Sequence, residues 1–291
     1  MEYPYYTLIY KLNKKKIKEL VKNFKVKTIN NPKLKNEYIA FLDKWNDHYE
    51  LNQITDLFTE TIRVKCRFSN KVSPLDYFTK NKERLLKKTE DIYQLREILY
   101  KETKLCSNFK ISHALSVLNL FKPKKWLDIS AGWGDRLLSA IFYGVDLYFA
   151  TDPNIELQDG YKKIITTFVP KKKQGNFIIL PEGFENAIIP YYDFDIVFTS
   201  PPFFDLEKYS TFKSNSLEKY KTENKWFTDF LLVSLEKSYK HLKKGGHMIL
   251  YIGYFKQINE MHIFLQKIMK YIGIIYFYDT KVRGLYVFQK I

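Results

Sequence analysis

The sequence predicts an α/β protein built on a doubly wound, mostly parallel sheet that ends in an antiparallel hairpin and is preceded by an α+β extension. From about residue 124, short apolar runs alternate with amphipathic stretches, as strands and helices do in such sheets. A glycine loop, Gly132-Trp133-Gly134, follows the first run and opens a helix. The apolar run 194–198 stops at Pro201-Pro202, since proline cannot continue a central strand.

Each element of this sheet has its own signal in the sequence. Apolar runs predict strands over 125–129, 146–152, 176–180, 194–200, 247–251, 274–278 and 284–289. Amphipathic spacing predicts helices over 135–143, 157–168, 217–242 and 257–271. Lys243-Lys244-Gly245-Gly246 is a predicted helix stop. The last two strands, separated by a short turn, predict the antiparallel hairpin.

The first part of the chain is less regular. Ser73-Pro74 predicts a helix start, followed by a charged amphipathic run to about Lys104 and a second helix over 111–121. Closer to the N-terminus we expect a strand at Tyr5-Thr7-Ile9, a basic helix over 14–24 and an extended segment over 62–68. We therefore divide the chain into a basic extension, 1–107, that recognises the substrate, and a catalytic domain, 108–291.

Composition limits the class of protein. With 45% apolar and 17% aromatic residues the chain can bury a large core, which excludes disorder. No apolar run approaches the length of a membrane span and no signal-peptide segment is visible, so we expect an intracellular protein, cytoplasmic or nuclear. Cys66 and Cys106 are too few for a disulfide framework or a cysteine-rich zinc site. We expect no metal.

The net charge of +16 has two explanations. Lysine bias of an AT-rich genome is one, because 42 lysines accompany 6 arginines. A nucleic-acid partner is the other, and we favour it because residues 1–110 alone hold 24 Lys and Arg against 14 Asp and Glu. The lysines between Lys11 and Lys27, interleaved with aromatic residues, suit phosphate contacts or a solvated helix face.

The glycine loop indicates an adenosyl cofactor. Gly132 and Gly134 allow a close backbone approach, and Asp152, at the end of the next strand, is placed to bind ribose hydroxyls. These features suit NAD or S-adenosylmethionine. The third glycine of a dinucleotide fingerprint is replaced by Leu137, and Asp135 at the helix N-terminus would repel a pyrophosphate. The carboxylate of Asp135 is compatible with a ligand that carries a positively charged sulfonium and ammonium, so S-adenosylmethionine is favoured over NAD. The alternative is that Asp135 only caps the helix.

The strand that ends at the two prolines carries the catalytic signature. It leaves Ser200, the Pro201 carbonyl and Phe203 at its carboxyl end, where open α/β sheets bind ligands. Two acceptors beside an aromatic ring can hold a planar ring by its exocyclic amine. Residues 108–291 resemble the class I S-adenosylmethionine-dependent amino-methyltransferases with an [Asp/Asn/Ser]-Pro-Pro-[Tyr/Phe/Trp] motif, here Ser200-Pro201-Pro202-Phe203.

This resemblance implies a class I methyltransferase fold and roles for particular residues. Ser200 and the Pro201 carbonyl would accept hydrogen bonds from the substrate amine, and Phe203 would stack on its ring. Asp128 would order the glycine loop, and Glu182 or Phe184 would hold the adenine unless they form a surface turn. The residues that we assign to the cofactor site are Asp128, Ser130, Ala131, Gly132, Gly134, Asp152, Glu182, Phe184, Asn108 and Lys110.

The expected acceptor is an exocyclic amine of a DNA base, flipped out of the helix. Serine at the first motif position resembles the cytosine-N4 branch, whereas aspartate or asparagine resembles the adenine-N6 and glutamine-N5 branches. Asp205, Glu207 and Tyr209 either complete the pocket or cap the next loop. Methylation of an RNA base, methylation of a protein glutamine and a catalytically silent nucleic-acid-binding subunit are the alternatives.

Overall fold

The computed structural model describes residues 2–5, 19, 38–42, 49–204, 207–209, 215–253, 255–277 and 284–291. The basic segment between Lys11 and Lys27, most of the expected strand at Tyr5-Thr7-Ile9, and Asp205 lie outside these residues. None of the helices in the described part is long and apolar enough to cross a membrane.

The core is an eight-stranded sheet of order β1-β9-β10-β8-β6-β3-β4-β5. Its strands are β1 (Tyr38–Leu42), β3 (Lys125–Asp128), β4 (Leu147–Thr151), β5 (Phe177–Leu180), β6 (Phe194–Thr199), β8 (Leu242–Tyr251), β9 (Lys270–Phe277) and β10 (Gly284–Gln289). All neighbours pair in parallel except β10, which lies antiparallel to both β8 and β9. The predicted class I methyltransferase fold, with its antiparallel hairpin, is confirmed.

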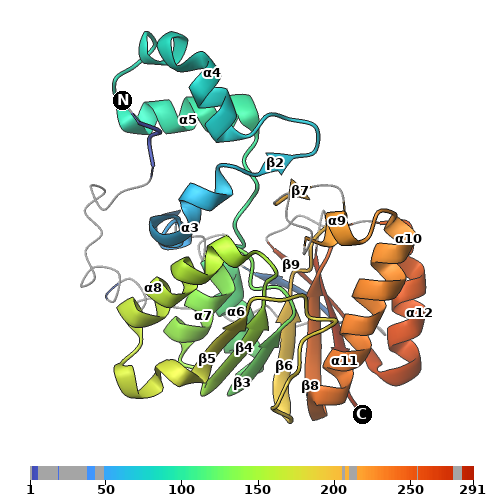
Figure 1. Ribbon diagram of the computed structural model, residues 1–291. Helices are drawn as coiled ribbons and strands as arrows, with labels where there is room; N and C mark the ends of the chain where they lie inside the picture. The colour runs from blue at the N-terminus through green and yellow to red at the C-terminus, as the bar shows by residue number, and fades with distance from the viewer. Residues whose placement is uncertain are drawn as a thin grey trace.

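Helices cover both faces of the sheet (Figure 1). The helices α6 (Ile111–Phe121), α7 (Asp135–Tyr143) and α8 (Gln158–Phe168) lie on one face, and α11 (Val233–His241) and α12 (Ile258–Ile268) lie on the other. Successive strand residues alternate between the two cores, because side chains of a strand point to opposite faces. Trp126 packs with the first set of helices and Leu127 with the second.

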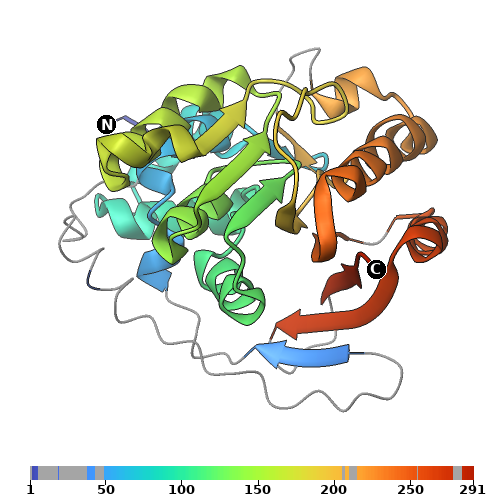
Figure 2. The same ribbon diagram turned by 90° about the horizontal axis from the view of Figure 1, so that it is seen from below.

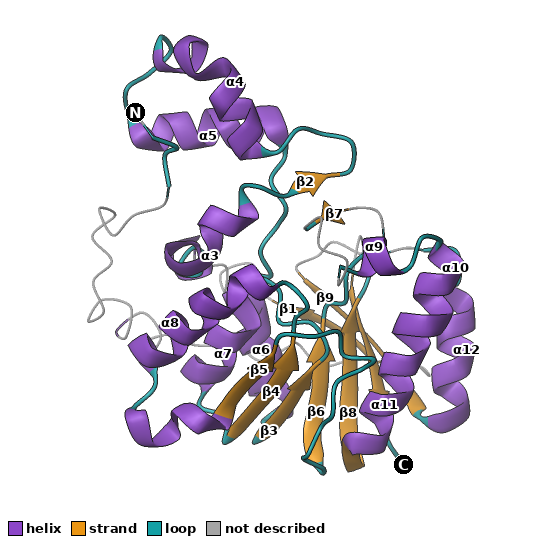
Figure 3. Cartoon of the chain, viewed as in Figure 1, coloured by secondary structure: helices purple, strands orange, loops and turns teal. Residues whose placement is uncertain are grey.

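The N-terminal region adds a helical arm and one edge strand. Its elements are α2 (Tyr49–Asn52), α3 (Asp56–Arg63), β2 (Arg67–Phe68), α4 (Pro74–Leu86) and α5 (Ile92–Thr103). The helices α4 and α5 form a hairpin with a hydrophobic core of its own, and this arm stands beyond α3, away from the sheet (Figure 3). The strand β1 runs along β9 at the sheet edge (Figure 2).

The helix start at Ser73 is confirmed, because its hydroxyl accepts a hydrogen bond from the Asp76 amide at 3.1 Å. The helical run from there to Lys104 is two helices, not one. Asp91 caps α5 by accepting hydrogen bonds from the amides of Tyr93 and Gln94, both at 2.9 Å. The expected extended segment 62–68 is wrong for its first part, since α3 continues to Arg63 and only Arg67 and Phe68 form a strand.

The expected helix 217–242 is interrupted. It consists of α9 (Ser216–Lys219), α10 (Glu223–Lys225), the π-helical turn η5 (Trp226–Leu232) and α11. Tyr220 breaks the helix by adopting an extended conformation in which its hydroxyl reaches Glu185. The expected end of this helix at Leu242 agrees with the observed end at His241 to within one residue. Gly245 and Gly246 lie in β8, which begins earlier than the expected strand 247–251, and their backbone bonds to Lys290.

Candidate active site

A pocket of about 360 Å³ opens at the carboxyl ends of β3, β4 and β6. The residues assigned from sequence that line it are Asn108, Lys110, Ser130, Ala131, Gly132, Asp152, Phe184, Ser200, Pro202 and Phe203. Glu207 and Tyr209 line it as well. Four assigned residues do not: Pro201, Asp128, Gly134 and Glu182. One pocket therefore contains both the glycine loop and most of the Ser-Pro-Pro-Phe motif.

The glycine loop is held in its tight turn by Asp152. Gly132 and Gly134 have φ angles of +62° and +97°, a region that favours glycine. A Cβ on Gly134 would lie 2.9 Å from the Ile164 Cδ1 atom. The Gly132 amide donates to one Asp152 carboxylate oxygen and the Asn154 amide to the other, each at 2.9 Å. Burial raises the pKa of Asp152 to about 6, while these two amides lower it.

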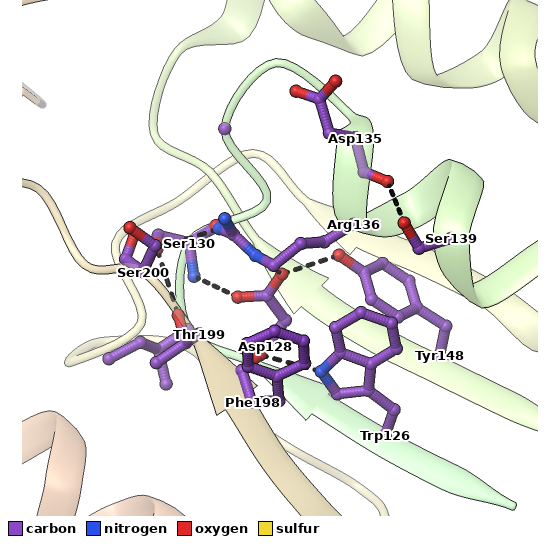
Figure 4. Close-up of polar contacts among 12 residues, drawn as sticks. Trp126, Asp128, Ser130, Asp135, Arg136, Ser139, Tyr148, Phe198, Thr199 and Ser200 are labelled. Atoms are coloured by element: carbon purple, nitrogen blue, oxygen red, sulfur yellow. Dashed lines mark hydrogen bonds and ion pairs between the residues drawn. The ribbon is translucent and has the colours of Figure 1, made fainter. Parts of the chain in front are cut away.

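Asp128 supports the loop from below (Figure 4). It is fully buried and accepts hydrogen bonds from Arg136 Nε at 2.7 Å and from the Tyr148 hydroxyl at 2.8 Å. The Ser130 amide donates to its other carboxylate oxygen at 3.2 Å. Arg136 in turn donates to the Ser130 carbonyl. Asp128 thus orders the loop through buried charge pairing, and it does not face the pocket.

The Ser-Pro-Pro-Phe motif is tied directly to the glycine loop. The Ser130 hydroxyl donates to the Ser200 carbonyl at 2.8 Å, which fixes the two loops side by side (Figure 4). Beyond Ser200 the pocket has an aromatic wall. The Phe203 and Tyr251 rings have centroids 6.3 Å apart, and Tyr251 packs edge-on against Phe109 at 5.3 Å. Sequence reasoning missed Tyr251 and Phe109, although Tyr251 ends a strand at the same sheet edge.

A second missed contribution comes from α3. The Thr55 hydroxyl donates to the Asp135 carboxylate, and the Thr59 hydroxyl donates to the Trp133 carbonyl at 2.9 Å. The helix α3 can pack this closely against α8 because Gly160 of α8 has no side chain. A Cβ at Gly160 would lie 2.8 Å from the Thr59 Cγ2 atom. Asp135 is 2% exposed and lines the pocket, and its burial raises its pKa to about 7. No sequence signal links residue 55 to residue 135.

A lysine from α11 holds the loop after β5 in place by hydrogen bonds to its backbone. Lys237 Nζ donates to the carbonyl oxygens of Phe184, Glu185 and Ala187, each at 2.9 Å. Glu185, which sequence reasoning passed over in favour of Glu182, lines the pocket. One of its carboxylate oxygens accepts a hydrogen bond from the Tyr220 hydroxyl at 2.9 Å.

Replacing Lys237 by methionine is expected to loosen this loop. Hydrogen bonds that involve a charged group contribute roughly 1.5–3 kcal/mol each, so amides of residues 183–187 should exchange with deuterium at least about tenfold faster. The matched control is Lys240→Met, one turn further along α11, which removes only an exposed pair with Glu236. Equal exchange in both variants would contradict this role of Lys237.

Three buried polar atoms on the pocket wall have no hydrogen-bond partner among the described residues. They are Asn108 Oδ1, Asn154 Nδ2 and Glu185 Oε2, two acceptors and one donor. Orphaned buried groups of this kind carry a desolvation cost that a bound ligand can remove. S-adenosylmethionine presents amine N–H donors at both ends and ribose hydroxyls between them, so the pocket chemistry fits this cofactor.

The described residues contain no cluster of three or more His, Cys, Asp or Glu side chains that could hold a metal ion. No family model matches the sequence. No curated protein matches it either.

Several solved structures resemble the fold. TrmN from Thermus thermophilus is 13% identical with a TM-score of 0.47, over 63% of this chain and 49% of that chain. A TehB-like SAM-dependent methyltransferase from Corynebacterium glutamicum is 14% identical with a TM-score of 0.43, over 74% and 97%. An rRNA methylase from Streptococcus thermophilus is 12% identical with a TM-score of 0.43, over 62% and 96%.

The chain thus spans about half the length of TrmN. The assignment of the fold rests on the strand order and on the antiparallel β10.

Proposed function

We propose that this protein is an S-adenosylmethionine-dependent N-methyltransferase whose acceptor is an exocyclic amine of a DNA base, the N4 amine of cytosine or the N6 amine of adenine. The observation that carries the proposal is the single pocket that contains the glycine loop and the Ser-Pro-Pro-Phe motif, bonded to each other through Ser130 and Ser200. A methyl donor and an amine acceptor have to meet in one site, and the presence of both loops in one pocket supports this proposal.

The cofactor half of the pocket uses the glycine loop and three polar positions. Asp135 and the free oxygen of Asn108 would bind the ammonium of the methionine part. Asp152 would bind the ribose hydroxyls, and Glu185 Oε2 would accept the N–H of the adenine. When bound, S-adenosylmethionine supplies an electrophilic methyl group whose transfer leaves a neutral thioether.

The acceptor half uses the motif and the aromatic wall. Ser200 lines the pocket, and its Oγ would accept one N–H group of the substrate amine, which localises the nitrogen lone pair toward the methyl carbon. The Pro201 carbonyl is the second acceptor that the motif implies, and it belongs to a residue outside the pocket lining. A base outside the helix loses its stacking, and Phe203 with Tyr251 would replace it, a contribution of roughly 1–3 kcal/mol per base. The N–C bond would form as the bond between sulfur and the methyl carbon breaks, and the nitrogen would then lose one proton to solvent water, so no oxidant or reductant is needed.

The choice of a nucleic acid rests on charge and on the motif. The chain carries a net charge of +16, which favours a polyanionic substrate over a protein amide. Serine at the first motif position favours DNA as the substrate. The presence of Gly132, Gly134, Asp152 and the complete motif favours an active enzyme over a catalytically silent subunit. The arm of α4 and α5, which ends four residues before the pocket-lining Ser107, supplies surface for a large substrate.

The proposal is tested by methyl transfer from labelled S-adenosylmethionine to duplex DNA, single-stranded DNA and RNA, followed by digestion to nucleosides and mass identification. We expect label in N4-methylcytosine or N6-methyladenine from DNA. Label in an RNA nucleoside would change the proposed substrate from DNA to RNA and would leave the proposed methylation of an exocyclic amine unchanged. Cofactor binding without label in any nucleic acid would overturn the proposal and turn attention to protein amides.

A further inference from the structure

A short two-stranded ladder at the rim of the pocket joins the arm to the loop that follows the catalytic motif. In it, β2 pairs antiparallel with β7 (Glu207–Lys208) (Figure 3). One face of this ladder looks into the pocket, since Glu207 is 5% exposed, lines the pocket and accepts a hydrogen bond from the Ser107 amide at 3.3 Å. Phe68, which pairs with Glu207, packs against the core on the same side.

The other face of the ladder presents like charges to solvent. Arg67 and Lys208 are directly opposite each other and both are exposed. Two like charges at opposed ladder positions repel and destabilise the pair. Arg67 has a carboxylate partner, Asp76, only at 3.5 Å between exposed side chains, and Lys208 forms no ion pair with the described residues.

A third cation lies at the same ladder. Lys104, at the end of α5, places its ammonium 3.8 Å from the centroid of the Phe68 ring. The three side chains come from three separate parts of the chain, the start of the arm, its end and the loop after the motif. Exposed positive charge is therefore present on both faces of the ladder at the pocket rim, and it would attract a polyanionic strand that crosses the rim.

We propose that Arg67, Lys104 and Lys208, which we name the ladder cations, bind the phosphodiester backbone of DNA next to the base that occupies the pocket. This inference rests on the proposed function. A base in the pocket remains bonded to its own strand, and the phosphates on each side of it have to cross the pocket rim. There the ladder cations neutralise them, and the bound strand relieves the repulsion between Arg67 and Lys208.

The test compares two triple variants with the same change in charge. The first is Arg67→Gln, Lys104→Gln and Lys208→Gln. The control is Lys171→Gln, Lys172→Gln and Lys173→Gln in the exposed 3-10 helix η4 (Lys171–Asn176), which precedes β5 and so lies at the opposite end of the strands. Binding of a fluorescent single-stranded oligonucleotide is measured by anisotropy at several salt concentrations, together with thermal unfolding of each free protein.

We expect the first variant to lose at least about tenfold in affinity at low salt, with the slope of log K against log salt smaller by about two, because each phosphate contact on a single strand contributes about 0.7. Its melting temperature should stay close to that of the wild type, because removal of the Arg67–Lys208 repulsion offsets the loss of the exposed Arg67–Asp76 pair and of the Lys104–Phe68 contact. The control should keep the wild-type slope to within about half a unit.

Equal losses in the two variants would overturn the ladder site, because the effect would then follow from net charge alone. Unchanged binding in the first variant would overturn it as well. Methylation of DNA by a protein whose ladder variant binds normally would reject the ladder site and keep the proposed function. If binding depends on the ladder cations but no polymer is methylated, the ladder site would be kept and the proposed function would be rejected.

Discussion

Replacing Ser200 by alanine is expected to lower kcat about 100-fold while the affinity for S-adenosylmethionine stays unchanged. The hydroxyl is one of two acceptors proposed for the substrate amine, and removing one preorganised polar group at the reacting atoms typically costs 10²–10³ in rate. The loop should keep its place, because its bond to the glycine loop runs from the Ser130 hydroxyl to the Ser200 carbonyl and not to the side chain.

Phe203→Ala should act differently, by raising KM for the nucleic acid. Lost stacking of roughly 1–3 kcal/mol corresponds to about 5-fold to 150-fold weaker binding of the flipped base. Phe203→Tyr keeps the ring and should keep KM. Single-turnover methylation and calorimetric titration of the cofactor separate the two effects, with Thr166→Ala on the exposed side of α8 as the hydroxyl control. Normal turnover by Ser200→Ala would remove the motif from the chemistry.

Cofactor affinity is expected to fall as the pH is lowered through about 7, because of Asp135. Burial raises the pKa of this carboxyl to about 7, and Asp56 raises it too, whereas the Thr55 hydrogen bond and the charges of Arg63 and Arg136 lower it. A cationic amine binds the ionised form. The affinity should therefore lose up to about tenfold for each pH unit below the pKa.

The stability of the free protein should change in the opposite sense. The pKa of Asp135 is above its ordinary value of 3.8, so the folded state binds the proton more tightly than the unfolded state. Its contribution to stability is complete below pH 3.8 and is lost as the pH rises through about 7. Asp135→Asn should raise the melting temperature at pH 8 and remove this part of the pH dependence of cofactor binding.

Calorimetric titrations and thermal unfolding between pH 5.5 and 8.5 measure both effects. Thr55→Val removes the hydrogen bond that lowers the pKa, so the loss of affinity should begin at a higher pH, whereas Thr55→Ser should restore the wild-type profile. A profile for Asp135→Asn identical to that of the wild type would show that another group binds the cation.

Hydrophobic patterns located the strands and helices of the sheet closely, because the helices bury one face, the central strands bury both faces, and loops separate the elements. The helix 135–143 agrees with α7 at both ends. The single helix expected over 217–242 failed at Tyr220, where a tertiary hydrogen bond to Glu185 outweighs helix propensity. No local pattern reports such a partner.

The residues of the candidate site also divide into those that a local sequence pattern predicts and those that depend on tertiary packing. Gly132, Asp152 and Ser200 lie where strands end, and parallel strands bring their ends to one edge, so the sequence predicts that they meet. Thr55 and Lys237 reach the site from helices packed against it. Their contribution depends on how α3 and α11 dock, which is a property of the folded core and has no motif.

The position of β1 has a consequence for the order in which the chain acquires its structure. Tyr38 pairs with Gly273 and Leu42 with Phe277, so an early segment of the chain completes the sheet beside one of its last strands. During synthesis, β1 has no neighbour until nearly all of the described chain has left the ribosome. The backbone of β1 stays unpaired until then, so this long-range edge of the sheet forms late in synthesis.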